Sequence, residues 1–310
     1  MKNVLFATTA LVGMGVAGSA FAEAHTGVAL SGSAEMGVTY YDDGTNDRAV
    51  FHNDIDVTFT LSGATDNGSL TFGATIDLDE VGDGDNLDFE NSVFVSGDFG
   101  TLSMGDVDSA YDNVHIEVPA GGLSDEADVA SGGDPLDGLT PEQLRYDYSF
   151  GDLTVSASLG LADQQPTNDE AGGTSTATDD AYAVGVAYGT DLGNMAVNVG
   201  VGYHDAGTGN EAIAGSLSVG FGDLEVIGSY QAVEIAGVDD DIIGVGATYS
   251  TGALGFGVAY ETSDAADIVQ GYVTYDLTGG AELVAAASLV DDQVTGVETT
   301  RAGFGIGLGF

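Results

Sequence analysis

Carboxylates dominate the side chains of this sequence that could do chemistry. The chain carries 50 Asp and Glu residues against 4 Lys and Arg residues, so its formal net charge at pH 7 is −46. This balance argues against nucleic-acid binding, because neutralising phosphates requires Lys and Arg. The chemistry that it favours is electrostatic, since rings of carboxylates select cations in a pore and clusters of oxygen ligands hold divalent metals.

Two acid-rich stretches resemble oxygen-rich sites for Ca²⁺. One is Asp239-Asp240-Asp241 and the other runs from Asp79 to Asp85. Neither has the ligand spacing of an EF-hand loop, and acidic tips of surface loops are commoner than true metal sites. The sequence therefore predicts no cofactor. It leaves open Ca²⁺ at the acidic loops, and divalent ions are expected as general counterions.

The four histidines give no sign of a catalytic centre. They are His25, His52, His115 and His204. No two of them have the short spacing of a zinc site, and no Ser or Cys nucleophile accompanies them in a recognisable motif. The sequence therefore predicts that the protein is not an enzyme.

The first 22 residues have the pattern of a secretion signal. Lys2 provides a basic start, an apolar stretch follows over positions 4–16, and Ala20-Phe21-Ala22 is a small-x-small cleavage signal. Residues 1–22 are therefore expected to be removed during export through a Gram-negative periplasm, which leaves residues 23–310 as the folded protein.

Alternation with a period of two is the main structural signal in the rest of the chain. Between Ala302 and Phe310 every second residue is apolar, while the alternate positions hold glycine. Sixteen such segments are expected, at 28–41, 51–63, 69–79, 87–97, 101–107, 142–150, 153–162, 180–189, 194–203, 211–221, 224–233, 241–250, 254–262, 267–276, 281–290 and 299–310. Their lengths, near ten residues, and their even number are typical of tilted strands in a membrane barrel.

The connections between these segments support a barrel. Short turns such as Gly151-Asp152 and Gly222-Asp223 alternate with longer polar loops, which is the barrel pattern, and residues 108–141 form one loop with no strand pattern. A soluble sandwich or solenoid would also alternate, but its second face should carry many charged residues. Here that face is mostly Gly, Ala and Ser, and glycine on an inner wall keeps a lumen open or lets a loop pack closely.

Three patches resemble the general porins of Gram-negative bacteria, most closely the alphaproteobacterial type. The run from Asn91 to Asp106 (NSVFVSGDFGTLSMGD) resembles the two strands and tight turn before the third external loop of that family. The run from Leu144 to Tyr148 (LRYDY) resembles the strand after that loop, and Phe310 resembles the C-terminal aromatic residue.

The resemblance implies an all-β fold, a 16-stranded antiparallel transmembrane β-barrel whose long third external loop folds inward. It also implies a homotrimer in the cell outer membrane, crossed many times by the chain. The expected partners are outer-membrane lipid, lipopolysaccharide and the barrel-assembly machinery, which would read Phe310.

The same resemblance implies a pore constriction in which acids on the loop face basic residues on the wall. Arg145 and Arg301 are the wall candidates, because alternation puts both on the lumen face. The family commonly has Arg or Lys near the position of Asp106, so this chain has few basic residues to form the basic side of the constriction. The loop candidates are Glu117, Asp125, Glu126 and Asp128.

The function expected from these features is passive diffusion of small hydrophilic solutes and ions through a water-filled channel that prefers cations. Two alternatives remain at this stage. One is a porin selective for a single class of solute, although the expected strands show no line of lumen-facing aromatic residues. The other is a barrel with no transport role that serves at the cell surface.

Overall fold

The computed structural model describes residues 26–79, 88–123, 133–139, 142–162 and 179–310. The predicted signal segment therefore lies outside the described residues. Sixteen strands are present, namely β1 (Gly27–Asp42), β2 (Asp47–Ala64), β3 (Leu70–Asp79), β4 (Asp88–Gly97), β5 (Gly100–Gly105), β6 (Gln143–Phe150), β7 (Leu153–Gly160), β8 (Ala181–Leu192), β9 (Met195–Asp205), β10 (Asn210–Phe221), β11 (Leu224–Ile235), β12 (Val238–Thr251), β13 (Leu254–Thr262), β14 (Ala266–Thr278), β15 (Ala281–Asp292) and β16 (Val297–Gly309). Two short 3-10 helices, η1 (Asp112–Val114) and η2 (Asp137–Leu139), lie between β5 and β6.

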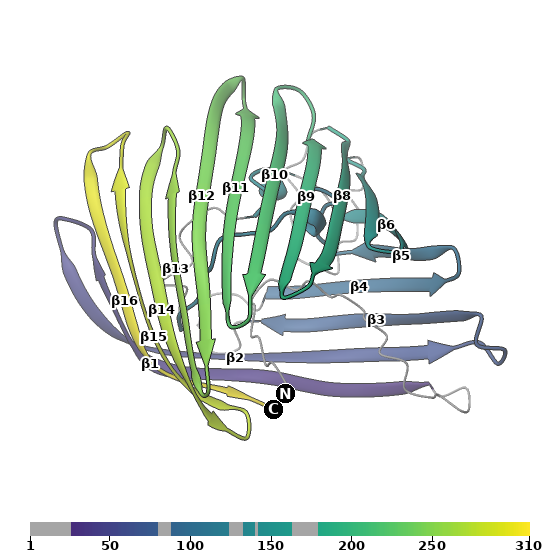
Figure 1. Ribbon diagram of the computed structural model, residues 1–310, viewed down its shortest axis with the longest axis horizontal. Helices are drawn as coiled ribbons and strands as arrows, with labels where there is room; N and C mark the ends of the chain where they lie inside the picture. Colours follow the sequence, from purple (N-terminus) through teal and green to yellow (C-terminus); the bar gives the residue numbers. More distant parts are fainter. Residues whose placement is uncertain (1–25, 80–87, 124–132, 140–141, 163–178) are drawn as a thin grey trace.

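The strands form one closed antiparallel barrel (Figure 1). Each strand pairs with its neighbour in sequence, and β1 closes the ring by pairing with β16 from Ser33–Gly309 to Asp42–Thr300. The backbone N–H of Phe310 continues this seam by donating to the carbonyl oxygen of Gly32 at 2.9 Å. Closure gives each described strand a hydrogen-bonded neighbour on both sides, as a barrel in lipid requires.

The two rims of the barrel differ in their connections. One rim carries tight turns, such as Gly151-Asp152 between β6 and β7 and Gly222-Asp223 between β10 and β11. Gly151 and Gly222 both have a φ of 65°, which glycine adopts without the steric penalty of a side chain. The other rim carries the β5–β6 connection, residues 106–142. The barrel prediction is therefore confirmed in strand number and antiparallel order.

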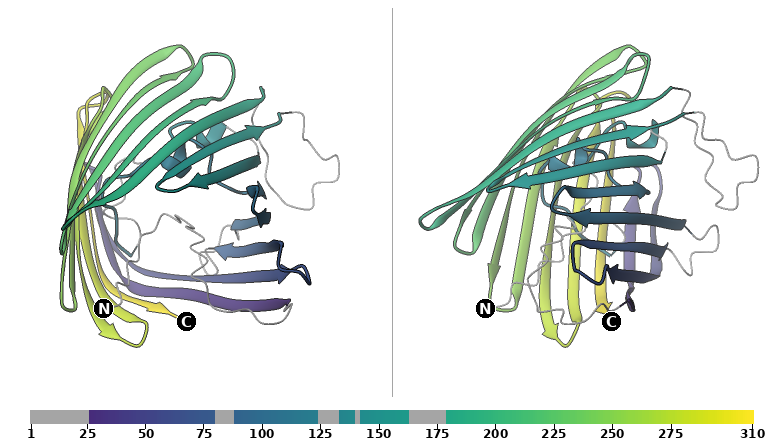
Figure 2. Two further views of the ribbon diagram at one scale, coloured as in Figure 1. Left: turned by 45° about the vertical axis from the view of Figure 1, so that its right-hand side comes forward. Right: turned by 90° about the vertical axis from the view of Figure 1, so that its right-hand side faces the viewer.

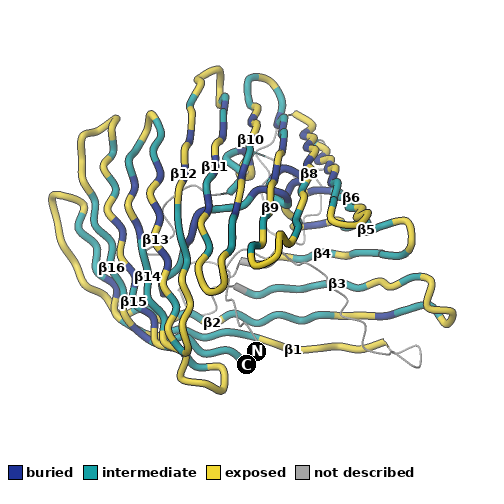
Figure 3. Tube along the Cα trace, in the orientation of Figure 1, coloured by how far each residue is buried: buried dark blue, intermediate teal, exposed yellow. Residues whose placement is uncertain are grey.

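Burial follows the alternation of the sequence (Figure 3). Along β8, Tyr182, Val184 and Val186 are exposed on the outward face, whereas Ala181 and Ala183 are buried on the inward face. The barrel therefore turns its large apolar side chains outward and its small ones inward, the reverse of a soluble protein.

Within the described residues, no helix has the length and apolar character needed to cross a membrane.

The expected strand boundaries hold to within a few residues. The largest difference is at the first hairpin, where a loop over 42–50 was expected but β1 and β2 pair up to Asp42–Asp47. Asp43 holds the tight turn, because its Oδ1 accepts the backbone N–H groups of Thr45 and Asn46 at 2.9 and 2.7 Å. Their polar character favoured a loop in the sequence, but in the structure residues 43–46 form a tight turn and the residues on either side of it pair as strands.

Candidate functional site

The described parts of the β5–β6 connection lie inside the ring of strands (Figure 2). We call residues 106–123 the outgoing limb and residues 133–139 the return limb. The outgoing limb crosses the inner wall and is bonded to several strands. Its hydrogen bonds to the wall include Ala110 N to Ser158 Oγ (3.0 Å, β7), Ile116 N to Ser216 Oγ (2.8 Å, β10), Tyr111 Oη to Gln231 Oε1 (2.6 Å, β11) and Gln270 Nε2 to Pro119 O (3.0 Å, β14).

Glycines on the inner wall allow this close approach. A Cβ added at Gly202 of β9 would lie 3.0 Å from Tyr111 Cα, and one at Gly244 of β12 would lie 2.8 Å from Val118 Cγ1. The same limb also lies against Gly185, Gly200 and Gly246, and its Leu123 packs on Gly37 and Gly305. Of the two roles considered for glycine on an inner wall, close packing of a loop is therefore observed at these positions.

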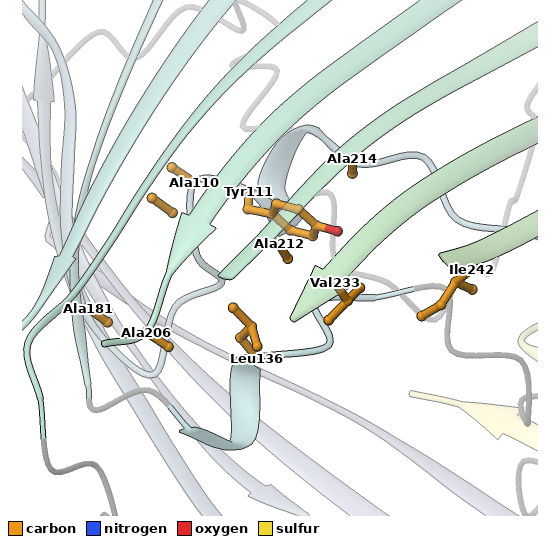
Figure 4. Close-up of a cluster of buried hydrophobic side chains, with 10 residues drawn as sticks. Ala110, Tyr111, Leu136, Ala181, Ala206, Ala212, Ala214, Val233 and Ile242 are labelled. Carbon is orange, nitrogen blue, oxygen red and sulfur yellow. The ribbon is translucent and has the colours of Figure 1, made fainter. Parts of the chain in front are cut away.

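A buried apolar cluster also holds the connection against the wall (Figure 4). Tyr111 of the outgoing limb and Leu136 of the return limb both have no exposed surface. Their neighbours on the wall are small or branched residues, Ala181, Ala183, Ala206, Ala212, Ala214, Val233 and Ile242, together with Ala110 of the outgoing limb. Both limbs therefore share one core with β8 to β12.

Acidic groups gather where the two limbs meet. The position of a Cβ on Gly133 would be 3.4 Å from Glu117 Oε1 and 3.7 Å from Asp112 Oδ1. Burial, and next the charge of Glu117, raise the pKa of Asp112 to about 8. Asp112 is therefore mostly protonated at neutral pH, and the predicted site residue Glu117 lies beside it.

His115 is a buried histidine that lies between Asp112 and Glu117 in the sequence of the outgoing limb. Its ring stacks on Tyr111 with 6.0 Å between ring centroids, and neither ring nitrogen has a hydrogen-bond partner among the described residues. Burial lowers the pKa of His115 to about 4, so the ring is neutral at ordinary pH. It offers no hydrogen-bonded catalytic pair.

Arg145 of β6 lies on the inner wall at the start of the outgoing limb. Its Nε donates to Asp147 Oδ2 at 3.0 Å, and its Nη1 donates to the carbonyl oxygen of Asp108 at 2.8 Å and lies 3.7 Å from Asp108 Oδ2. The side chain is 12% exposed. Two carboxylates therefore offset the charge of this predicted wall residue.

Arg301 of β16 lies elsewhere in the barrel. Its Cζ is 5.9 Å from the ring centroid of Tyr41 in β1, and the Cζ of Arg48 in β2 is 5.2 Å from the same centroid. Strands β1 to β5 separate Arg301 from Arg145 in the ring. The structure therefore does not bring the two predicted arginines together, and it groups Arg301 with Arg48 instead.

An acidic wall, which the sequence reasoning missed, lines the inner face of β1 to β4. Glu35 shares a face with Gly37, which lies under Leu123 of the outgoing limb, so Glu35 faces the lumen. Cross-strand pairing extends this face, and we call its carboxylates, Glu35, Asp54, Asp56, Asp77 and Glu90, the wall acids. The sequence signal that could have revealed this wall was the alternation of these acids with apolar residues such as Ile55, which places the acids on one face of the strand.

Three of the predicted loop residues, Asp125, Glu126 and Asp128, lie outside the described residues. Most of the acidic stretch 79–85 does so as well. In the remaining acidic stretch, Asp241 Oδ1 accepts from Tyr230 Oη at 2.7 Å and Asp240 Oδ1 accepts from Asp264 N at 2.9 Å. Across the described ranges no three acidic or histidine side chains are grouped so that they could hold a metal ion.

A closed antiparallel barrel with an apolar outside, a polar inside and a segment bonded across its interior is a transmembrane channel. The family comparison agrees: the model for Gram-negative porins matches residues 7–295, and the chain belongs to this family.

Known relatives extend the comparison. The porin of Rhodobacter capsulatus is 30% identical, with 83% of this chain and 92% of the relative covered. A solved porin structure refined at 1.8 Å resolution is 26% identical, with a TM-score of 0.69, and the match covers 92% of this chain and all of that one. An anion-selective porin from Comamonas acidovorans is similar in fold, with a TM-score of 0.66 at 16% identity over 92% of this chain and all of that one. The protein is thus an outer-membrane porin channel, and family and fold point to a channel rather than an enzyme.

Proposed function

We propose that this porin forms a water-filled channel for small hydrophilic solutes and ions, and that the channel prefers cations. The observation that carries the proposal is the placement of like charges on the wall. Glu35 is paired across the strands with Asp54, and Asp77 with Glu90, all on the inner face. Like charges directly opposite each other are unfavourable. Cations in the lumen would relieve this repulsion. The Nε2 of His52 lies 3.5 Å from Glu35 Oε2 on the same wall.

The few arginines support the same sign of selectivity. Arg145 lies between Asp108 and Asp147, so it adds little net positive charge to the lumen. At about 4 Å two unit charges interact by roughly 1 kcal/mol in bulk water and about 4 kcal/mol at an effective dielectric constant near 20. Carboxylates that face a narrow path would therefore change relative permeability several-fold. The fold alone does not set this sign, because the similar porin from Comamonas acidovorans is described as anion-selective.

We propose that the functional unit is a homotrimer in contact with outer-membrane lipid and lipopolysaccharide, and that assembly machinery reads Phe310. Membership of the porin family supports this assembly. The outward face supports the lipid contact, since Tyr182, Val184 and Val186 are all exposed there. Calcium at acidic loop tips is a further proposal, supported by the number of carboxylates alone.

The test is the reversal potential of the channel in a planar bilayer under a KCl gradient. We expect the wild type to prefer K⁺, most strongly in dilute salt, because the screening length is about 8 Å at physiological ionic strength. Asp54→Asn with Asp56→Asn should lower this preference, and Arg145→Gln should raise it. The matched control is Asp152→Asn with Asp223→Asn, which removes two acids from the tight turns. A wild type that prefers anions would refute the proposed selectivity.

A further inference from the structure

A buried polar cluster joins both limbs of the β5–β6 connection to the barrel wall. At its centre is Asp134 of the return limb, whose side chain is 1% exposed, beside His204 of β9, whose side chain is 0% exposed. Asp134 Oδ2 lies 2.6 Å from His204 Nδ1 and accepts a hydrogen bond from Ser109 Oγ at 2.6 Å. Asp134 Oδ1 accepts the backbone N–H of Leu136 at 2.9 Å.

These bonds come from three separate parts of the chain. Ser109 belongs to the outgoing limb, Leu136 to the return limb and His204 to the wall. The 2.6 Å contact between Asp134 Oδ2 and His204 Nδ1 is a hydrogen bond that ties the return limb directly to β9. The Tyr111 ring lies 6.3 Å from the His204 ring, which places the cluster against the apolar core shared by both limbs.

Asp134 differs from Asp137 of the same limb in its surroundings. Asp137, one turn further along the same limb, is exposed, so it can meet ions in the lumen. Asp134 is sealed from water, so it contributes to the geometry of the connection rather than to the charge along the permeation path. The Nε2 of His204 is buried with no hydrogen-bond partner among the described residues, so the contact with Asp134 is the hydrogen bond that fixes this ring. Such a pair favours one arrangement of the surrounding groups, because other arrangements leave more buried polar atoms without a partner.

We infer that Asp134 and His204 are positioning residues of the channel, which hold the return limb against β9 and thereby set the bore of the lumen. The barrel itself is closed by the backbone ladder from β1 to β16, so the pair is not needed for closure. Loss of the pair leaves a folded barrel in which the return limb moves away from the wall. The inference rests on the proposed function only in that the lumen conducts.

The experiment compares Asp134→Asn and His204→Gln with two matched controls. Asp152→Asn and Asp223→Asn each remove one carboxylate from a tight turn on the rim opposite the β5–β6 connection. The readouts are the open-channel current noise, the largest uncharged sugar that enters proteoliposomes, and amide hydrogen exchange of residues 106–123.

We expect the first two variants to fold and to conduct with greater open-channel noise and an altered sugar cut-off. Amide exchange in the outgoing limb should be at least about tenfold faster, since removing one partner of a buried pair is strongly destabilising. Exchange in the strands should not change. The double variant should be no worse than either single one, because both remove the same contact. The two controls should behave like the wild type in sugar cut-off and exchange.

Wild-type exchange, noise and sugar cut-off in both variants would overturn the inference. If neither variant assembles, Ser109→Ala serves instead, because it removes one hydrogen bond to Asp134 and leaves the pair intact. It also removes the bond that Ser109 Oγ accepts from Asp112 N at 3.1 Å, so the readout is the return limb, where Leu136 N donates to Asp134. Exchange of residues 133–139 should increase in Ser109→Ala, and unchanged exchange there would refute the inference. A wild type that does not conduct would refute the proposed function, while the exchange data would still decide the positioning role.

Discussion

Replacing Gly200 of β9 by alanine should push the outgoing limb into the lumen. A Cβ there would overlap the carbonyl oxygen of Val114 and would lie 2.9 Å from both the Val114 carbonyl carbon and Ser216 Oγ. Carbon atoms pack best at about 3.5–4.0 Å, so the limb must move by at least about 0.6 Å, and by more to clear the oxygen. The shift would also disturb the hydrogen bond of 2.8 Å from Ile116 N to Ser216 Oγ.

The expected cost of this overlap is about 1–3 kcal/mol, the range for overpacked positions in well-packed interiors. Since 1.4 kcal/mol corresponds to a factor of ten, the undocked population of the limb should rise by roughly five-fold to more than a hundred-fold. Single-channel recording should therefore show a lower mean conductance and more frequent fluctuations than in the wild type.

Gly220→Ala is the matched control for this prediction. Gly220 lies on the inner face of the neighbouring strand β10, and a Cβ there would make only ordinary contact, with Ala196 Cβ at 3.6 Å. This variant should conduct like the wild type. If Gly200→Ala also conducts like the wild type while folding normally, the outgoing limb is not docked on β9 as described.

Further predictions concern pH, selectivity and assembly. Asp112 lies outside the strands, and its pKa is raised from 3.8 to about 8 in the docked connection. Because the docked state favours the protonated carboxyl group, protonation stabilises docking. This stabilisation is complete below pH 4 and is lost as the pH rises to about 8. Channel noise should therefore increase between pH 6.5 and 8.5 in the wild type but not in Asp112→Asn, and an equal increase in both would refute this assignment. Replacing Asp125, Glu126 and Asp128 together by Asn or Gln should lower cation preference in reversal-potential measurements, and an unchanged potential would show that these acids do not face the path. Deleting Phe310 removes its bond to Gly32 and should leave soluble periplasmic protein, as fractionation would reveal; normal assembly would count against recognition of this end. Light scattering in mild detergent should give a trimer, and a uniform monomer would contradict the proposed assembly.

The barrel could be predicted from the sequence because each strand and tight turn depends on a pattern within a few consecutive residues. The alternation from Ala302 to Phe310 and the glycines of the tight turns need no knowledge of distant residues. The inward placement of Arg145 followed from the same period, since a strand has only two faces.

The details of the site depend on contacts between distant residues. Asp134 and His204 are 70 positions apart, and no local pattern marks them as a pair. The glycines under the outgoing limb could be recognised only once the path of that limb was known. The wall acids were visible as alternating residues, but the pairing of Glu35 with Asp54 depends on strand register, which the sequence did not provide.

Single-channel recording of the purified wild-type protein in a planar bilayer tests the central claim most directly. A water-filled lumen narrowed by a docked connection predicts discrete, long-lived conductance steps, with a reversal potential under a KCl gradient that corresponds to a preference for K⁺. Correctly folded protein that inserts into the bilayer but gives no conductance steps would contradict the account of this barrel as an open channel.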